Sequence, residues 1–122
     1  MDATYVISAD HDAGVIRITM GGFFTHVDIA RFRSDLTEKI GRLSGGANSH
    51  LTLCDVREMK IQPQEIVAAF AQIVGSGPFR SHRLAFVTGS TLARMQTRRL
   101  TDREGVAFFH DEGVAEEWLL GA

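Results

Sequence analysis

Two spacings of apolar residues alternate along this chain. Short apolar runs, or apolar residues at every second position, are typical of strands and occur at Thr4–Ala9, Val15–Met20, His50–Arg57, His82–Thr88 and Val106–Phe109. Apolar residues three or four positions apart are typical of helices and occur at Thr25–Leu43, Pro63–Val74, Leu92–Leu100 and Gly113–Leu120. The pattern therefore predicts the order β-β-α-β-α-β-α-β-α.

The run His50–Arg57 is predicted to form the central strand. Apolar or small residues continue without interruption up to Asp55, which is typical of a strand buried on both faces. Strands that alternate with helices imply right-handed crossovers and a parallel sheet. The first two strands, joined by a turn at Asp10–Gly14 and ended by Gly21-Gly22, form a hairpin. We expect one α/β domain over residues 1–122, with a mostly parallel five-stranded sheet, one antiparallel edge strand and four helices.

Three of the expected helices carry start signals. Thr25 stands three residues before Asp28, which is the spacing of a capping box with Asp in place of the usual Glu. Pro63 fits the first position of the second helix, and Asp111 can cap the last one. The last helix is expected to pack through Val114, Ala115, Trp118 and Leu119.

Composition places the chain among ordinary globular proteins. It has 122 residues, 44% hydrophobic and 23% charged, with a net charge of −2 and one cysteine. No internal disulfide can form, the first residues do not resemble a signal peptide, and no apolar run reaches the ~20 residues of a membrane span. We expect a cytoplasmic protein. The third helix carries Arg94, Arg98 and Arg99 without aromatic residues for base stacking, so nucleic acid is not expected as a partner.

Four features, in this order, carry a resemblance to a known family. They are the Gly21-Gly22 exit from the second strand, the acid within Leu53–Arg57, the strand Arg83–Val87 and the closing segment Phe109–Leu119. Together they resemble the STAS superfamily of sulfate transporters and anti-sigma-factor antagonists, in its SpoIIAA-like branch of small stand-alone bacterial proteins. The resemblance implies a singly wound sheet with helices mainly on one side, and a regulatory role.

The resemblance also directs attention to the start of the second helix. In the anti-sigma antagonists, a serine in an Asp-Ser-Ser-Gly turn is phosphorylated there. Here Ile61–Ile66 contains no serine or threonine, and ungapped counting places Glu65 at the phosphorylated position. No phosphorylation site is therefore predicted. Glu65 is either a permanent negative charge favoured by the helix dipole, or an ordinary glutamate of a first turn.

Ligands and partners of open parallel sheets meet the carboxyl ends of the strands. This rim is expected at residues 21–25, 55–65, 88–91 and 110–112. The candidate partner-binding residues are Asp55, Arg57, Gln64, Glu65, Ser90, Thr91 and Arg94. Asp55 could act as a general base or phospho-acceptor, but the acid cluster for magnesium and the lysine of such a site are missing. A structural acid that binds loops or a helix N-terminus is the preferred interpretation, and no catalytic residue is predicted.

The other reactive residue types give weaker signals. None of the five histidines pairs at i,i+4, so no metal site is predicted. Cys54 lies within an apolar strand and is expected to be a buried, inert thiol. Gly89-Ser90-Thr91 could offer backbone N–H groups to an anion, yet it matches neither the Walker nor the Rossmann spacing.

The last two strands are apolar on both sides, so the sheet face without helices needs a cover. A second subunit, a helix folded across the face or an apolar ligand would serve, and we favour a homodimer. The predicted function is a non-enzymatic protein-interaction or regulatory module without a cofactor. A small-ligand binding protein, holding an apolar molecule on the open face or an anion at Ser90, is the alternative. An Asp- or metal-dependent enzyme ranks last.

Overall fold

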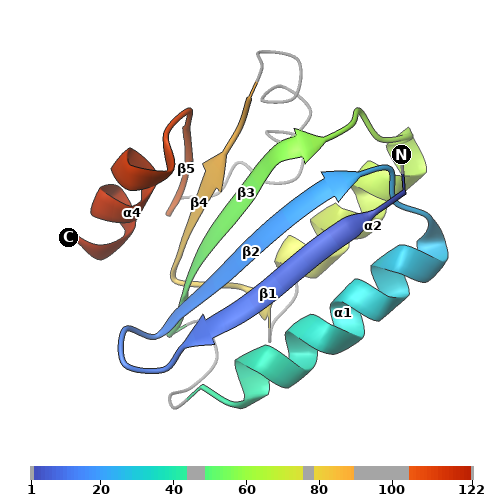
Figure 1. Ribbon diagram of the computed structural model, residues 1–122. Helices are drawn as coiled ribbons and strands as arrows, with labels where there is room; N and C mark the ends of the chain where they lie inside the picture. Colours follow the sequence, from blue (N-terminus) through green and yellow to red (C-terminus); the bar gives the residue numbers. More distant parts are fainter. Residues whose placement is uncertain (1, 44–48, 76–78, 90–104, 122) are drawn as a thin grey trace.

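The computed structural model describes residues 2–43, 49–75, 79–89 and 105–121 (Figure 1). Its strands are β1 (Thr4–Asp10), β2 (Val15–Gly22), β3 (Leu51–Met59), β4 (Arg83–Val87) and β5 (Val106–Phe109). Its helices are α1 (His26–Gly41), α2 (Gln64–Gly75) and α4 (Glu112–Leu120). The described part thus contains three of the four expected helices, because the one predicted at Leu92–Leu100 lies outside the described residues.

The five strands form one sheet in the order β1-β2-β3-β4-β5. β1 and β2 are antiparallel, whereas β2 to β5 are parallel to one another. β3 lies at the centre, with Cys54 opposite Ile18 of β2 and Phe86 of β4. The predicted central strand and the single antiparallel edge strand are confirmed (Figure 1).

Successive residues of β3 serve two separate hydrophobic clusters. Cys54 and Val56 belong to the cluster that α1 and α2 complete, whereas Leu53 belongs to the cluster that α4 completes. Side chains alternate between the faces of a strand, so a strand buried on both faces needs helices on both sides of the sheet. Figure 1 shows α1 and α2 on one side and α4 on the other.

The cover of the second face is therefore α4, a helix folded across it, which is one of the three covers considered from the sequence. Ala115 and Leu119 of α4 are buried against Leu53, Ala85 and their neighbours. The same face of β1 carries the exposed residues Thr4, Val6, Ser8 and Asp10. This outer part is mostly polar and needs no cover, so the homodimer stays a prediction without its packing argument.

Two of the three predicted helix starts are confirmed in atomic detail, whereas Pro63 directly precedes the first residue of α2 instead of occupying its first position. The Thr25 hydroxyl accepts from the Asp28 N–H at 3.2 Å, and the Thr25 N–H donates to the Asp28 carboxylate at 2.8 Å, which completes the capping box. Asp111 accepts from the Val114 N–H at 2.9 Å and caps α4. Val114 was expected in the packed face of α4, but it points outward and is 51% exposed.

Some element ends differ from the predicted ones. Gly21 and Gly22 are the last residues of β2 rather than the segment after it, and β3 continues two residues beyond Arg57. A Cβ on Gly21 would stand 3.1 Å from the Cβ of Glu58, so a larger residue would push the two strand ends apart.

The single tyrosine ties β1 to α1. The Tyr5 hydroxyl donates to the Asp35 carboxylate, and the Tyr5 ring meets Phe32 edge-on at 5.3 Å between centroids. Burial and the hydrogen bond to Asp35 raise the pKa of Tyr5 to about 12. Because this pKa lies above that of the unfolded chain, the stability gained is present below pH ~10 and is lost as pH rises through the folded pKa.

We expect Tyr5→Phe to lower the free energy of unfolding by about 1 kcal/mol in urea titrations near neutral pH, because one side-chain hydrogen bond is lost. Asp35→Asn should shift the ultraviolet titration of Tyr5 back toward the ordinary tyrosine value. A wild-type midpoint near pH ~10 would contradict this assignment.

His50 is buried at the start of β3, and its Nε2 atom has no hydrogen-bond partner among the described residues. Burial lowers the pKa of His50, and a hydrogen bond with the backbone of Phe79 opposes this shift only in part. The unfolded chain therefore binds a proton more readily, and the stability that His50 confers at neutral pH is lost as pH falls below about 6.5.

We expect His50→Gln to flatten the decline in unfolding free energy between about pH 7 and pH 5. An equal decline in both proteins would contradict the assignment to His50.

Candidate functional site

The four parallel strands β2 to β5 end at the same edge of the sheet, which we call the carboxyl edge. β3 brings Asp55 and Arg57 to this edge, and α4 begins there directly after β5. The first turns of α1 and α2 lie at the same edge (Figure 1). The geometry expected for ligands and partners of an open parallel sheet is therefore present.

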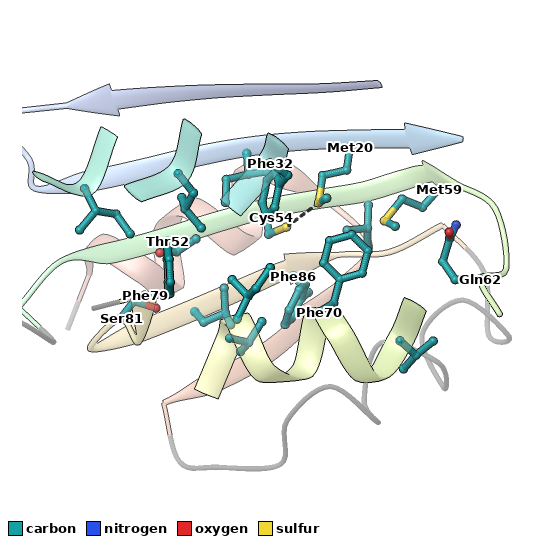
Figure 2. A pocket seen from close by; sticks show the side chains of 18 of the residues that line it. Met20, Phe32, Thr52, Cys54, Met59, Gln62, Phe70, Phe79, Ser81 and Phe86 are labelled. Atoms are coloured by element: carbon teal, nitrogen blue, oxygen red, sulfur yellow. Dashed lines mark hydrogen bonds between the residues drawn. The ribbon is translucent and has the colours of Figure 1, made fainter. Parts of the chain in front are cut away.

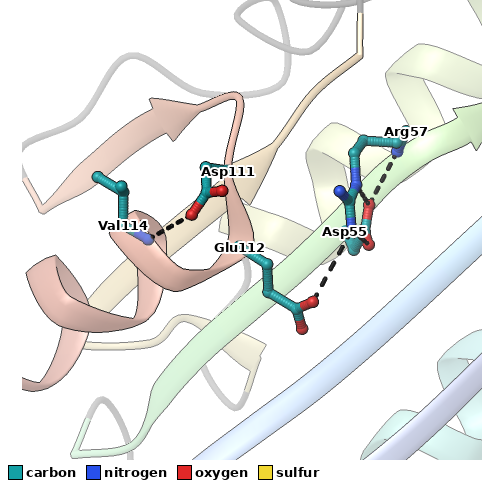
Figure 3. A network of polar contacts seen from close by, with 5 residues as sticks. All are labelled: Asp55, Arg57, Asp111, Glu112 and Val114. Atoms are coloured by element: carbon teal, nitrogen blue, oxygen red, sulfur yellow. Dashed lines mark hydrogen bonds and ion pairs between the residues drawn. The ribbon is translucent and has the colours of Figure 1, made fainter.

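Asp55 and Arg57 form a two-pronged ion pair (Figure 3). Arg57 Nε donates to Asp55 Oδ1 at 3.0 Å, Nη2 donates to Oδ2 at 2.7 Å, and the Arg57 backbone N–H donates to Oδ1 at 3.0 Å. Partial burial raises the pKa of Asp55, but the hydrogen bonds and the charge of Arg57 outweigh it and hold the pKa below its usual value. In the described part of the chain the Asp55 carboxylate thus binds Arg57 of its own strand, and its role as a structural acid stays a prediction.

Arg57 also connects the exit of β3 to the start of α4. Its Nη2 lies 3.8 Å from Glu112 Oε2, and both side chains are solvent-exposed (Figure 3). The hydrogen bonds from Arg57 to Asp55 and the charge of Asp55 raise the pKa of Arg57, with smaller contributions from the charges of Glu112 and Asp111. Glu112 lies within the rim range 110–112 that was expected from the sequence, although it was not one of the named candidate residues.

Gln62 likewise lies within the expected rim range 55–65 without being one of the named candidate residues. Its side-chain amide is buried, donates to the Gly22 carbonyl at 2.9 Å and also donates to the Lys60 carbonyl. Its Oε1 atom accepts from the Phe24 N–H at 2.9 Å. Gln62 therefore fixes the segment that leaves β2 against the segment that leaves β3.

Exposed apolar side chains stand on these two segments. Phe23 is 47% exposed, Ile61 is 43% exposed, and Val27 in the first turn of α1 is 67% exposed. We call Phe23, Val27 and Ile61 the edge patch. A few exposed apolar residues are normal on any protein; these three stand at the carboxyl edge, the edge where ligands and partners of open parallel sheets bind.

The other predicted rim residues have different outcomes. Gln64 and Glu65 are exposed in the first turn of α2, and within the described ranges neither makes a hydrogen bond or ion pair with Asp55 or Arg57. Ser90, Thr91 and Arg94 lie outside the described residues. The structure thus brings together Asp55 and Arg57 and adds Glu112.

The remaining reactive groups are placed as follows. Among the described residues, no group of three or more His, Cys, Asp or Glu side chains could hold a metal ion. His110 contacts the Thr88 carbonyl through Nδ1 at 3.3 Å. The backbone N–H of His82 donates to the backbone carbonyl of His50 at 2.8 Å. Cys54 is buried as predicted, and burial together with the nearby charge of Asp55 raises the pKa of its thiol to about 12.

None of the helices in the described part of the chain has both the length and the apolar character that a membrane span requires.

Comparison with known proteins identifies the fold. The chain is similar to the crystal structure of an uncharacterized DUF3478-family protein from Shewanella loihica PV-4, which has a SpoIIAA-like fold. The TM-score is 0.71 at 18% sequence identity, and the match covers 96% of this chain and 93% of that one. No family model and no curated protein matches the sequence. The fold is SpoIIAA-like, as the resemblance in sequence implied.

The Asp55–Arg57 pair gives a testable electrostatic result. We expect Arg57→Gln to raise the pKa of Asp55 toward the ordinary aspartate value, because the carboxylate loses its cationic donor while its partial burial remains. A carbon-detected NMR titration of the aspartate carboxyl groups measures this change. Arg17→Gln, which breaks the ion pair of Arg17 with Glu116 elsewhere on the sheet, should leave Asp55 unchanged. An unchanged Asp55 midpoint in Arg57→Gln would contradict the assignment.

The sign of the stability effect follows from the direction of the shift. The folded pKa of Asp55 is lowered, so its stabilising contribution is present above the pKa of about 3.9 of an unfolded aspartate and is lost as pH falls through the folded value.

Proposed function

We propose that this domain is a non-enzymatic regulatory module that binds a protein partner through its carboxyl edge. The observation that carries the proposal is the edge patch, an apolar group at the edge where partners of open parallel sheets bind. The charged side chains of Arg57, Glu58, Lys60 and Glu65 belong to the same strand exit and the following helix start, and all four are exposed. An apolar centre with a charged rim is the usual composition of a non-obligate protein interface.

The state of Asp55 supports a binding role over a catalytic one. A general base must be free to accept a proton, whereas the two carboxylate oxygens of Asp55 accept hydrogen bonds from Arg57. A lowered pKa also makes the carboxylate a weaker base. On this proposal Asp55 holds the exit of β3 in place, and Arg57 presents its remaining surface to the partner.

Glu65 fits the same proposal. It is exposed in the first turn of α2, where the helix dipole favours a negative charge. By ungapped counting, Glu65 would correspond to the serine that is phosphorylated in the anti-sigma antagonists. Glu65 would then give the partner a constant negative charge in place of a switched one.

The test compares two exposed surfaces of the same protein. Partners are captured by crosslinking in cells of the source organism, identified by mass spectrometry, and purified for calorimetry. The double substitution Phe23→Ser/Ile61→Ser should weaken binding by at least about tenfold, because the apolar centre of the interface is lost. Val6→Ser, at an exposed apolar residue of β1 on the opposite sheet face, should leave the affinity unchanged. Equal affinities in the two variants would rule out the carboxyl edge as the contact surface.

A further inference from the structure

The face of the sheet beneath α1 and α2 is incompletely filled. A cavity of about 90 Å³ lies between this face and the two helices. Figure 2 shows Met20 and Cys54 from the sheet and Phe32 and Phe70 from the helices turned toward it. The cavity is on the opposite side of the sheet from α4, and it does not involve the ion pair of Asp55.

The size and lining of the cavity restrict what can occupy it. Protein interiors are close-packed, and an empty apolar void costs stability in proportion to its volume. A single water needs roughly 10–15 Å³ of such space together with several polar partners. This cavity is several times larger, and most of its wall is aliphatic, aromatic or sulfur-containing side chains. An apolar molecule suits it better than a water cluster does.

The polar groups of the wall lie at the two ends. Thr52 and Ser81 are together at one end, whereas Met59 and Gln62 are at the other (Figure 2). Lys60, between Met59 and Gln62 in sequence, also lines the cavity although it is exposed, so the cavity reaches the surface at this end. Lys60 makes no ion pair with any described residue.

We propose that this cavity binds a small apolar carboxylic acid, with its chain under α1 and α2 and its carboxylate at Lys60. An apolar wall with one cation at the mouth is complementary to a molecule with an apolar body and a single negative end. The volume favours a short chain, since a cavity of about 150 Å³ holds benzene. This site does not depend on the proposed function of the carboxyl edge, although both use the segment after β3.

The binding test uses methyl-labelled methionine, because Met20 and Met59 both line the cavity. Butanoate, hexanoate, octanoate and hexanol are titrated separately into the full chain, and the methyl resonances are followed by NMR. We expect saturable shifts of the Met20 and Met59 resonances with the carboxylates. Hexanoate should bind about two- to fivefold more tightly than hexanol, as an exposed ion pair allows. Lys60→Gln should remove this difference.

A cavity-filling variant tests the location. Val67→Phe adds volume from α2, where Val67 is half-buried and lines the cavity, and it should abolish the hexanoate shifts while raising Tm. Val114→Phe, on the exposed side of α4, should bind hexanoate as the wild type does. If Val67→Phe does not fold, Cys54→Leu fills the cavity from the sheet side and should give the same loss.

Three results would overturn the proposal. They are the lack of saturable shifts with every carboxylate, undiminished hexanoate binding in the folded filling variant, and equal wild-type affinities for hexanoate and hexanol. Loss of partner binding in Phe23→Ser/Ile61→Ser with intact hexanoate binding would support the two sites separately.

Discussion

The burial of β3 on both faces is the constraint on which the other features of this structure depend. Leu53 faces α4 while Cys54 and Val56 face α1 and α2, so both layers of helices pack against the same strand. Neighbouring strands fix its position through their register. Asp55 lies within this strand between the buried residues Cys54 and Val56, and Arg57 balances its charge.

Much of this arrangement follows from spacing and local chemistry. The capping pair of Thr25 and Asp28 and the cap at Asp111 are local hydrogen bonds, so a short stretch of sequence suffices to predict them. The central strand was recognisable because apolar or small residues continue without a charged residue from Leu51 until Asp55. The SpoIIAA-like fold followed from the order of such elements.

The features that the sequence did not predict depend on tertiary geometry. The spacing of apolar residues indicates that α4 has an apolar side, but it does not indicate which face of the sheet the helix covers. For this reason a second subunit was favoured as the cover of the second face. Val114 was predicted to be packed but is exposed, because Ala115 and Leu119 are the residues of α4 that face the sheet. The contacts of Gln62 with Gly22 and of Glu112 with Arg57 join residues 40 or more positions apart, so the sequence predicted their region but not their partners. The cavity arises because side chains of elements that are distant in sequence do not fill the space between them, and the spacing of apolar residues along the chain does not indicate such a gap.

Adjacent residues of the segment after β3 belong to the two proposed binding sites. Ile61 belongs to the exposed edge patch, Lys60 lines the cavity, and Gln62 fixes both against the exit of β2. The proposed cavity site and the proposed partner surface therefore both use the short stretch of backbone that the hydrogen bonds of Gln62 hold in place. Its rigidity comes from hydrogen bonds to buried groups rather than from regular secondary structure.

The order of strands in space is the same as their order in the chain. Each new strand adds beside the one made before it, and none has to insert between two that are already paired. During synthesis the chain can therefore extend the sheet from one side only, beginning with the hairpin of β1 and β2. Because paired strands are close in sequence, little entropy is lost in closing the loops between them. The strands therefore leave the ribosome in the order in which they pair in the sheet, and the free edge of β3 can pair with β4 as soon as β4 has been synthesised.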